Sequence, residues 1–498
     1  MYLGVDCSTQ SMSGMLYDSG QNKIIKEISI DFSSHFPEFT FEGDKSINEC
    51  VVNPILWISA LDKLFVEFKK AGVDFSKLKG IGGSAQQHAT VYLNKKFKEN
   101  WDWNEDLEST IKPLLSIERS PIWMDNSTEK ECHEINSSLS SEDYAIENSG
   151  SVVTERFSGP QIRRFAKNFK NEYEQTSVVH LLSSFMTCLF VGHDCPMESS
   201  DASGMNLLNL NSMQWDESLV NSTDYELKDK LPELIDGNQV AGKIASYFVE
   251  KYGINPEASV VYFTGDNISS ALGIGCDDSS MAVISLGTSD TLFLYNDSFQ
   301  VNVRNSNTFC HTNGGYISLL CFQNGAFARD KIRSDLNYDW EQFDKCLSDS
   351  TPGNNEIVQL PFFGPEINPH LPNGKEGFNL ERKFEATEIV RSLLEAQAMN
   401  MNIQSKSMSQ QLKQIIVTGG GSNCDGFCQI IANVFQCKVI RKNISNTASL
   451  GGIVRAYSVI EKEIFEMDDE IKDITEPQPE TESIYNKLEG HFKELLSK

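Results

Sequence analysis

Three stretches of the chain place glycines or hydroxyl-bearing residues directly after a run of apolar residues. They read VDCSTQS (5–11), SLGTSDT (285–291) and VTGGGSN (417–423). Backbone N–H groups and hydroxyls in a tight turn bind phosphate oxygens, and glycine lets a ligand approach the backbone closely. One such turn alone is more often an ordinary hairpin turn, but three in this order favour a phosphate-binding site.

The first of these turns also carries a carboxylate, Asp6. A carboxylate repels phosphate, so its presence there indicates a Mg²⁺ ion between the two, usually bound through water. Ser8 and Thr9 can donate hydroxyl hydrogen bonds toward a terminal phosphate. The alternative is that Asp6 only closes the hairpin through a hydrogen bond to its own turn.

A second carboxylate, Asp201, lies among small residues in SSDASGMN (199–206). This setting fits a tight turn at the lip of a cleft, where an aspartate can accept a proton from an attacking hydroxyl group. The alternative is a turn aspartate that caps its own backbone. The residues alone do not choose between these two roles.

The elements that must position these residues alternate between strands and helices. Apolar strands precede the turns, and residues 2–18 and 281–296 both read as β-hairpins. Helical spacing is found at 55–71, 385–408, 427–435, 448–460 and 484–496. This alternation predicts an α/β fold, and two glycine-containing hairpins that each open one half of the chain suggest duplicated domains. We also expect a buried helix at 178–192, a helix at 125–135 capped by Asp125, Asn126 or Ser127, and a loop at 461–483.

Composition restricts the function classes. The 498 residues carry 43 basic and 70 acidic side chains, a net charge of −27, which disfavours nucleic acid and anionic membranes as partners. Twelve scattered cysteines without a C-x-x-C pair predict reduced thiols in a cytoplasmic protein rather than disulfides or a zinc site. No signal peptide is expected, and both a monomer and a homodimer remain open. The chain has neither a P-loop motif nor a G-x-G-x-x-G after a strand.

The order of the three turns resembles that in the actin-like ATPase superfamily, and within it the FGGY carbohydrate kinase family. Five further stretches resemble eukaryotic-type members that phosphorylate D-xylulose: AQQHATVYL (85–93), SPIWMDNST (120–128), ERFSGPQI (155–162), DASGMNLLNL (201–210) and FTGDN (263–267). The resemblance runs from Tyr2 to about Tyr457. It implies two ribonuclease H-like domains flanking a central cleft: residues 1–275 would bind the sugar and supply the first phosphate hairpin, and residues 276–498 would bind the nucleotide.

The resemblance also implies a reaction and a set of residues. ATP and D-xylulose would give ADP and D-xylulose 5-phosphate, with Asp201 as general base and Asp6 holding Mg²⁺. The implied sugar-side residues, besides Asp201, are Gln87, His88, Arg156, Asp266 and Asn267. The implied nucleotide-side residues are Ser8, Thr9, Gly287, Thr288, Ser289, Trp340, Gly420, Gly421 and Cys424. Cys424 stands where the family has an asparagine, so its nucleotide contact is in doubt. Ile268 stands where proline is common, which would change the stiffness of the loop rather than the chemistry.

Other functions compete with this one. The same chemistry on ribulose, gluconate or glycerol is the nearest alternative, because the shape of the pocket is invisible in the sequence. A nucleotide-driven switch, as in actin or the chaperone ATPases, would lack the sugar-side motifs. A sugar-binding regulator without catalytic activity would not need both Asp6 and Asp201.

Overall fold

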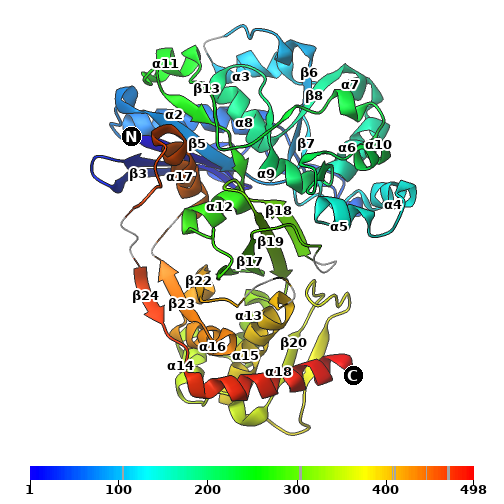
Figure 1. Cartoon of the computed structure of the whole chain (residues 1–498), viewed down its shortest axis with the longest axis vertical. Coiled ribbons are helices and arrows are strands. Elements are labelled where there is room, and N and C mark those ends of the chain that lie inside the picture. The colour runs from blue at the N-terminus through cyan, green and yellow to red at the C-terminus, as the bar shows by residue number, and fades with distance from the viewer. Residues whose placement is uncertain are drawn as a thin grey trace. The chain divides into compact units, whose positions relative to one another are not determined.

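The computed structural model describes residues 1–498 except 104–105, 302–305, 407, 409–410, 443, 445 and 468–470. Its contacts divide the chain into two compact units, which Figure 1 shows coloured along the sequence. The first unit comprises Met1–Gly275, Thr308–Gly315 and Ser445–Asp468, and the second comprises Cys276–Asn307, Tyr316–Ile444 and Asp469–Lys498. Each unit contains its own hydrophobic core. Within the described ranges, no helix has the length and apolar character that crossing a membrane requires.

A mixed sheet forms the centre of the first unit. Its order is β13-β14-β5-β1-β2-β3, with β15 beside β5. The bounds are β1 (Tyr2–Cys7), β2 (Ser11–Asp18), β3 (Lys23–Asp31), β5 (Gly80–Ala85), β13 (Val240–Lys243), β14 (Ser259–Val261) and β15 (Thr264–Gly265). Strands β1 and β2 form the predicted N-terminal hairpin, and β1 runs parallel to β5. The turns after β1, β5 and β15 therefore meet at one edge of the sheet.

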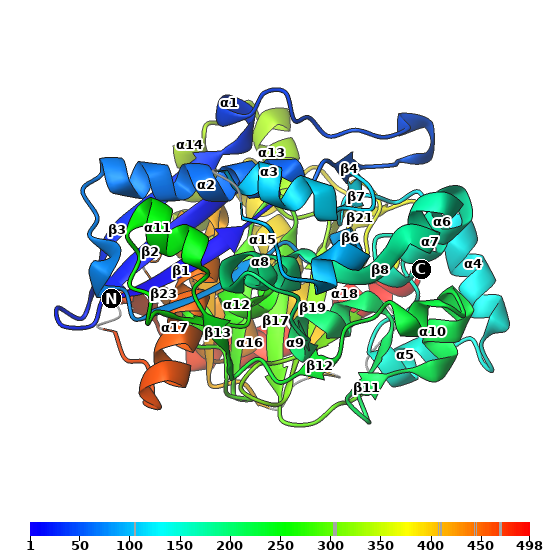
Figure 2. The same cartoon turned by 90° about the horizontal axis from the view of Figure 1, so that it is seen from above.

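Helices cover both faces of this sheet. Helix α17 (Thr447–Glu461) lies on one face, where glycines permit close contact: a Cβ on Gly4 would lie 1.9 Å from the Ser449 carbonyl oxygen, and one on Gly82 would lie 2.3 Å from that of Gly452. Helix α2 (Ile55–Lys70) lies on the other face, as Figure 2 shows. Two helices distant in sequence thus clamp the strand that carries Asp6.

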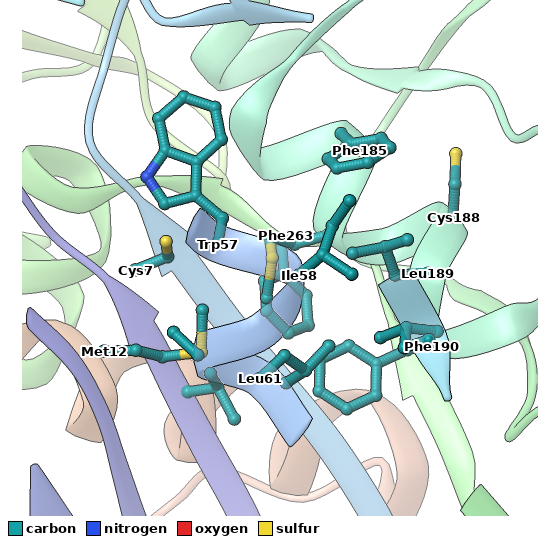
Figure 3. Close-up of a cluster of buried hydrophobic side chains, with 14 of the residues drawn as sticks. Cys7, Met12, Trp57, Ile58, Leu61, Phe185, Cys188, Leu189, Phe190 and Phe263 are labelled. Atoms are coloured by element: carbon teal, nitrogen blue, oxygen red, sulfur yellow. The ribbon is translucent and has the colours of Figure 1, made fainter. Parts of the chain in front are cut away.

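Aromatic and aliphatic side chains from α2 and α8 (Leu182–Val191) fill the core next to this sheet. Figure 3 shows part of the cluster, including Trp57, Leu61 and Phe190. All ten residues of α8 are buried. The segment 178–192 was predicted as one buried helix, and this was wrong: its first residues belong to β8 (Thr176–Leu181), which pairs with β6 (Thr90–Asn94). A continuous apolar run does not distinguish a buried strand from a buried helix, and the β-branched residues in the TSVV segment decide for the strand.

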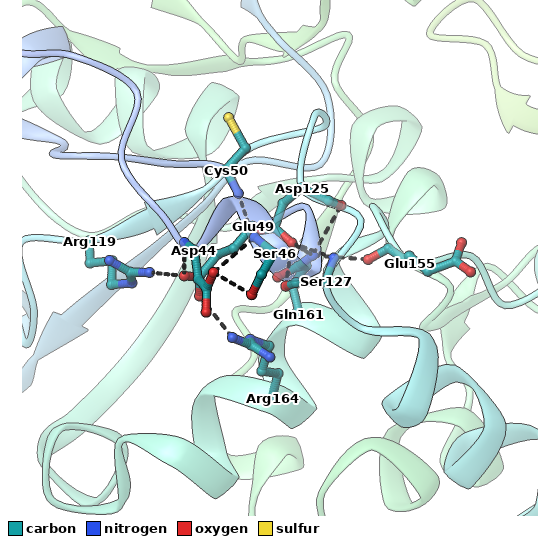
Figure 4. A network of polar contacts seen from close by, with 10 residues as sticks. All are labelled: Asp44, Ser46, Glu49, Cys50, Arg119, Asp125, Ser127, Glu155, Gln161 and Arg164. Carbon is teal, nitrogen blue, oxygen red and sulfur yellow. Dashed lines mark hydrogen bonds and ion pairs between the residues drawn. The ribbon is translucent and has the colours of Figure 1, made fainter.

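The helix expected at 125–135 begins later, as α4 (Glu129–Ser138), and none of the three proposed residues caps it. Instead the Asp125 carboxylate is buried and accepts hydrogen bonds from the backbone N–H groups of Cys50 and Ser127 and from the Gln161 side chain, each at 2.9 Å. Figure 4 shows this network and its neighbour around Glu49, which pairs with Arg119 and Arg164. Asp125 therefore ties the 120–128 loop to α6 (Ser158–Asn168) rather than starting a helix.

The remaining elements of the first unit are short. The helices are α1 (Phe32–His35), α3 (Leu107–Ile111), α5 (Tyr144–Ser149), α7 (Lys170–Gln175), α9 (Ser199–Ala202), α10 (Glu217–Thr223), α11 (Ser246–Tyr252) and α12 (Asp266–Ile274). The strands are β4 (Val51–Val52), β7 (Ser120–Pro121), β9 (Met197–Glu198), β10 (Leu208–Asn209), β11 (Gln214–Trp215) and β12 (Leu234–Ile235).

The second unit is built on another seven-stranded sheet, with β18 (Ser306–Cys310) at one edge. The order continues β19 (Tyr316–Phe322), β17 (Asp290–Asn296), β16 (Met281–Leu286), β22 (Gln414–Thr418), β23 (Lys438–Lys442) and β24 (Ile471–Thr475). The hairpin predicted at 281–296 is confirmed as β16–β17. The other elements are β20 (Gln359–Phe362), β21 (Lys375–Phe378), α13 (Ala326–Asp335), α14 (Trp340–Ser348), α15 (Ala386–Ser405), α16 (Asp425–Phe435) and α18 (Glu482–Ser497).

The acidic segment 461–483 is not a loop throughout, as had been expected. It contains β24, which pairs antiparallel with β23, and Asp473 accepts a hydrogen bond from Arg441 Nε at 2.7 Å. The strand has only five residues, two of them charged, and it lies in an acidic segment, so the composition concealed it.

Candidate active site

Three carboxylates lie near one another in the first unit. Asp6 ends β1, Asp201 lies in α9 and Asp266 begins α12. Burial raises the pKa of Asp6 to about 7, that of Asp201 to about 8 and that of Asp266 to about 6, and the Asp266 charge adds to the first two shifts. Carboxyl groups that hold protons near neutral pH are typical of sites that transfer protons.

Asp201 is positioned by two neighbours that the sequence reading did not single out. The Glu198 carboxylate accepts hydrogen bonds from the backbone N–H groups of Ser200 and Asp201, at 2.9 and 3.0 Å, so Glu198 caps α9. Ser183 of α8 donates its hydroxyl to Asp201 Oδ2 at 2.5 Å. Because Glu198 performs the capping, the carboxylate of Asp201 is not engaged with its own turn.

The other carboxylate oxygen, Asp201 Oδ1, is buried and has no hydrogen-bond partner among the described residues. The same holds for Gln87 Nε2, whose amide is oriented by Asn267 Nδ2 donating to Gln87 Oε1 at 2.8 Å. Both atoms lie beside Gly265: a Cβ there would be 2.6 Å from Asp201 Oδ1 and 2.9 Å from Gln87 Nε2. A buried acceptor and a buried donor thus lie beside the same glycine, and the Gln87 side chain is close enough to lower the pKa of Asp201. A hydroxyl group can bond to both atoms, donating to the first and accepting from the second.

His88 contributes a neutral imidazole. Its Nδ1–H donates to the Gly204 carbonyl oxygen at 2.8 Å, and its ring stacks on Phe157 with centroids 4.2 Å apart. Burial, with Arg156 nearby, lowers the pKa of His88 to about 3. The ring nitrogen Nε2 is therefore a hydrogen-bond acceptor at neutral pH.

Arg156 lies just before α6, the helix whose Gln161 bonds to Asp125. Its guanidinium carbon is 5.7 Å from the centre of the Phe157 ring, and it forms no ion pair within the described part of the chain. No described carboxylate therefore engages the five donors of this side chain, which lies close to His88.

The first hairpin turn has a more local set of contacts. Asp6 Oδ1 accepts from Ser84 Oγ on the adjacent strand β5 at 2.8 Å, so Asp6 does not close its own turn. Ser8 does: its hydroxyl donates to the Ser11 carbonyl oxygen at 2.9 Å. Thr9 Oγ1 accepts from Trp123 Nε1 at 2.8 Å, which links the turn to the 120–128 loop.

The second unit contains a cavity of about 490 Å³ beside the second hairpin. Six of the residues proposed for the nucleotide line it: Gly287, Thr288, Trp340, Gly420, Gly421 and Cys424. Ser289 lies in the same turn but is exposed and does not line the cavity. The cavity is also lined by apolar side chains such as Leu286 and Phe427, which give an aromatic base a surface to contact.

A buried ion pair holds the turn at this cavity. Arg329 Nη1 and Nη2 donate to the two oxygens of Asp290 at 2.8 and 2.9 Å, and Nη2 also reaches the Gly287 carbonyl oxygen at 3.3 Å. Asp290, the acid of the SLGTSDT stretch, therefore has both carboxylate oxygens bonded to Arg329. Arg329 carried no sequence signal, since a lone arginine on a helix is usually a surface residue.

Cys424 lines the cavity next to Asp344, another residue that sequence reasoning missed. Burial, followed by the Asp344 charge, raises the pKa of the Cys424 thiol to about 12. The thiol is therefore protonated and interacts with a carboxylate on the cavity wall.

Comparison with known proteins assigns most of the chain to one family. Residues 1–273 match the model of the FGGY family of carbohydrate kinases, N-terminal domain, and residues 282–458 match that of the C-terminal domain. The chain belongs to the FGGY family of carbohydrate kinases. It is therefore a phosphotransferase that uses ATP, and the family resemblance drawn from the sequence is confirmed.

Individual relatives extend this result. The chain is 32% identical to "Xylulose kinase" of Rattus norvegicus over 480 residues, covering 91% of this chain and 87% of that protein. It is 32% identical to "Xylulose kinase 2" of Arabidopsis thaliana over 483 residues, covering 92% and 86%.

Two crystal structures from Lactobacillus acidophilus, a ligand-bound xylulose kinase and a gluconate kinase, each align with a TM-score of 0.84 at 18% identity. Each alignment covers 99% of this chain and 97% of the other. The expected two-domain α/β fold is thereby confirmed, and because the two scores are equal the fold does not identify the sugar.

Proposed function

We propose that the protein transfers the γ-phosphoryl group of ATP to D-xylulose, giving ADP and D-xylulose 5-phosphate. The similarity to xylulose kinases over nine-tenths of the chain supports this substrate. The observation that carries the chemistry is the pair of buried, unpartnered atoms Asp201 Oδ1 and Gln87 Nε2 beside Gly265.

In the proposed reaction, a sugar hydroxyl group binds to both of these atoms. It donates its proton toward Asp201 Oδ1 and accepts from Gln87 Nε2, so its oxygen is oriented and made more nucleophilic as the proton leaves. The new bond joins the hydroxyl oxygen to the γ-phosphorus, the bond from that phosphorus to the β,γ-bridging oxygen breaks, and the proton remains on Asp201. His88, as a neutral acceptor, and Arg156, as a donor, bind other hydroxyl groups.

Asp6 would hold Mg²⁺, with Asp266 as the neighbouring carboxylate. Two buried carboxylates are a hard oxygen donor set, which suits this ion. Burial raises the pKa of both, and the Asp266 charge adds to the shift at Asp6, so a cation bound there would favour their ionised forms. The ion, when bound, neutralises charge on the phosphates.

We assign the two ligands to different units. The first unit, with residues 1–275 as its main part, binds the sugar and supplies the first phosphate turn through Ser8 and Thr9. The second unit, drawn mainly from residues 276–498, binds the nucleotide in the cavity lined by Gly287, Trp340 and Gly420.

A panel of sugars in an assay coupled to ADP release tests the substrate. The panel contains D-xylulose, D-ribulose, gluconate and glycerol, and we expect the highest kcat/KM for D-xylulose. A higher value for any other member would replace the proposed substrate, and ATP hydrolysis unaffected by every sugar would favour a nucleotide switch.

The matched variant Asp201→Asn should bind D-xylulose with similar affinity and lose turnover by several orders of magnitude; near-native turnover would remove Asp201 from the role of base.

A further inference from the structure

Helix α17 carries a guanidinium group that the proposed reaction does not use. Arg455 is 2% exposed, and its Nη2 donates to the Gly237 carbonyl oxygen at 2.8 Å. Its Nε and Nη1 are buried and have no hydrogen-bond partner among the described residues. Burying a cation with unused donors costs free energy, so packing alone does not account for this side chain.

This guanidinium and a carboxylate lie against the same glycine. A Cβ on Gly237 would lie 2.3 Å from Arg455 Nη2 and 2.7 Å from Glu198 Oε1. Burial lowers the pKa of Arg455, and the charges of Glu198 and Asp236 oppose that shift. His311 also lies nearby: burial, followed by the Arg455 charge, lowers the pKa of its imidazole to about 4, so it adds no positive charge there at neutral pH.

Glu198 is the residue that caps the helix of Asp201. It is 1% exposed, and its two oxygens accept from the backbone N–H groups of Ser200 and Asp201 at 2.9 and 3.0 Å. An ionised acceptor makes stronger hydrogen bonds than a neutral one, and a carboxylate buried to this degree is rarely found without a compensating charge. Arg455 supplies that charge.

The helix that carries Arg455 also contacts the elements of the other two carboxylates. It packs closely on β1, the strand of Asp6, and Ser269 of α12 donates its hydroxyl to the Ala448 carbonyl oxygen at 2.7 Å. Figure 1 shows α17 beside α12, the helix that Asp266 begins. Arg455 extends these contacts to the cap of α9, so one helix supports all three carboxylate-bearing elements.

We propose that Arg455 is a positioning residue: its charge acts through Glu198 to hold α9, and this fixes the direction of the Asp201 carboxylate. The inference rests on the proposed role of Asp201 as base. Arg455 has no hydrogen bond to Gln87 or His88 within the described part of the chain. Its loss should therefore affect turnover rather than sugar binding.

Substitutions of Arg455 in the full-length protein test this role. Arg455→Met keeps an unbranched side chain, removes the charge and the donors, and should lower kcat about 100-fold, as expected for a catalytic group displaced by about an ångström. The KM for the sugar should stay within about twofold of the wild-type value. Arg455→Lys keeps the charge and should recover most of the lost kcat.

Three results of these measurements would overturn the proposal. The first is a kcat within about threefold of the wild-type value in folded Arg455→Met, and the second is a raised KM with an unchanged kcat. The third is an Arg455→Lys variant no more active than Arg455→Met, since the charge would then not be what acts.

A double-mutant cycle with Glu198→Gln tests whether the effect passes through Glu198. The glutamine keeps one acceptor oxygen and lacks the charge, so adding Arg455→Met to it should lower kcat by less than about threefold more. Losses of kcat that multiply would show that Arg455 acts independently of Glu198 and would overturn the proposed path. Arg455→Gln, which also removes the charge, takes its place in the cycle if Arg455→Met does not fold.

Ile453→Val is the matched control for packing of the same helix. Ile453 Cγ1 would lie 2.9 Å from a Cβ on Gly4, so the shorter side chain loosens α17 against β1 and leaves Arg455 in place. It should lower the Tm and keep kcat within about twofold of the wild-type value. A loss of kcat as large as that of Arg455→Met would mean that packing alone explains the effect, against the proposal.

Failure of the proposed function is recognised separately. All these measurements use the sugar of the panel with the highest kcat/KM, so a substrate other than D-xylulose leaves the test of Arg455 intact. Near-native turnover of Asp201→Asn would remove the base itself, and with it the role proposed for Arg455.

Discussion

The two carboxylate oxygens of Asp201 have different environments. Oδ2 accepts from Ser183 at 2.5 Å, whereas Oδ1 is buried beside Gly265 with no partner among the described residues. Burial of such a group costs free energy in the ionised form, and this cost is what raises its pKa to about 8. The residue is thus held in place at one oxygen and left available at the other.

This pKa predicts a pH dependence of catalysis. A general base works only when deprotonated, so kcat/KM should rise about tenfold per pH unit below the pKa and level off above about 8. Asp6, with a pKa of about 7, titrates in the same range, so the rise of kcat/KM with pH reflects the three carboxylates Asp6, Asp201 and Asp266 together. Asp266→Asn removes a neighbouring like charge and should move the rising part of the kcat/KM profile to lower pH. A flat profile between pH 6 and 9 would contradict the proposed base.

The same shift predicts a stability effect. Because the Asp201 pKa is raised in the folded state, the folded protein holds a proton between about pH 4 and 8 that the unfolded chain has released, so the free energy of unfolding falls as pH rises across that window. The Asp201→Asn variant lacks the titrating carboxyl group, so its free energy of unfolding should not show this fall. At pH 8 the variant should exceed the wild type by a few kcal/mol, at about 1.4 kcal/mol per pKa unit.

Denaturant unfolding of both proteins at pH 4 and pH 8 measures this difference. The two should be similar at pH 4, where the carboxyl group is protonated in the folded state and largely protonated in the unfolded chain. A variant that is less stable at pH 8 would mean that Asp201 is ionised and well solvated in the folded protein.

At the scale of elements, the glycine turn after β22 predicts how the cavity of the second unit is used. A Cβ on Gly420 would meet no protein atom within 4 Å and its backbone is not in the left-handed region, so nothing in the fold requires glycine there. Gly420→Ala should therefore leave the Tm unchanged and raise the KM for ATP about tenfold, equivalent to about 1.4 kcal/mol. The KM for the sugar should not change.

Gly490→Ala is the matched control, because a Cβ at that glycine of α18 also meets nothing within 4 Å. It should alter neither KM. An unchanged KM for ATP in Gly420→Ala would move the nucleotide away from this turn.

The sequence was sufficient where a pattern is local. Both hairpins follow from apolar runs broken by glycine and hydroxyl residues, and the helices at 55–71 and 385–408 follow from apolar spacing. Errors arose where partners distant in sequence decide the outcome. Pairing with β6 makes β8 a strand, and pairing with β23 makes β24 one.

The candidate site shows the same division. Asp6 and Asp201 stood out because polar residues interrupt apolar or small-residue stretches, whereas His88 was implied only by the family resemblance. Ser183 and Arg329 lie within helices whose spacing is determined by packing, so only the folded structure shows that they contact Asp201 and Asp290. Glu198 precedes a helix too short to be recognised from sequence.

At the scale of the whole molecule, the assignment of one ligand to each unit predicts two separate footprints in hydrogen exchange. A non-hydrolysable ATP analogue should protect peptides covering 286–290 and 420–424, which contain residues that line the cavity of the second unit. D-Xylulose should protect peptides covering 84–88 and 199–206 in the first unit. Protection of the first-unit peptides alone by the nucleotide would reverse the assignment.

The first unit is assembled from three separated parts of the chain, and this affects synthesis. The segment Thr308–Gly315 contacts the Asp201 loop, with the Cys310 N–H donating to Ser203 Oγ at 3.0 Å, and α17 covers the sheet at Gly4 and Gly82. A ribosome that has completed residue 275 has made neither part. One apolar face of the sheet therefore stays uncovered until translation passes residue 461, so an N-terminal fragment ending at 275 should aggregate although it contains most of the first unit.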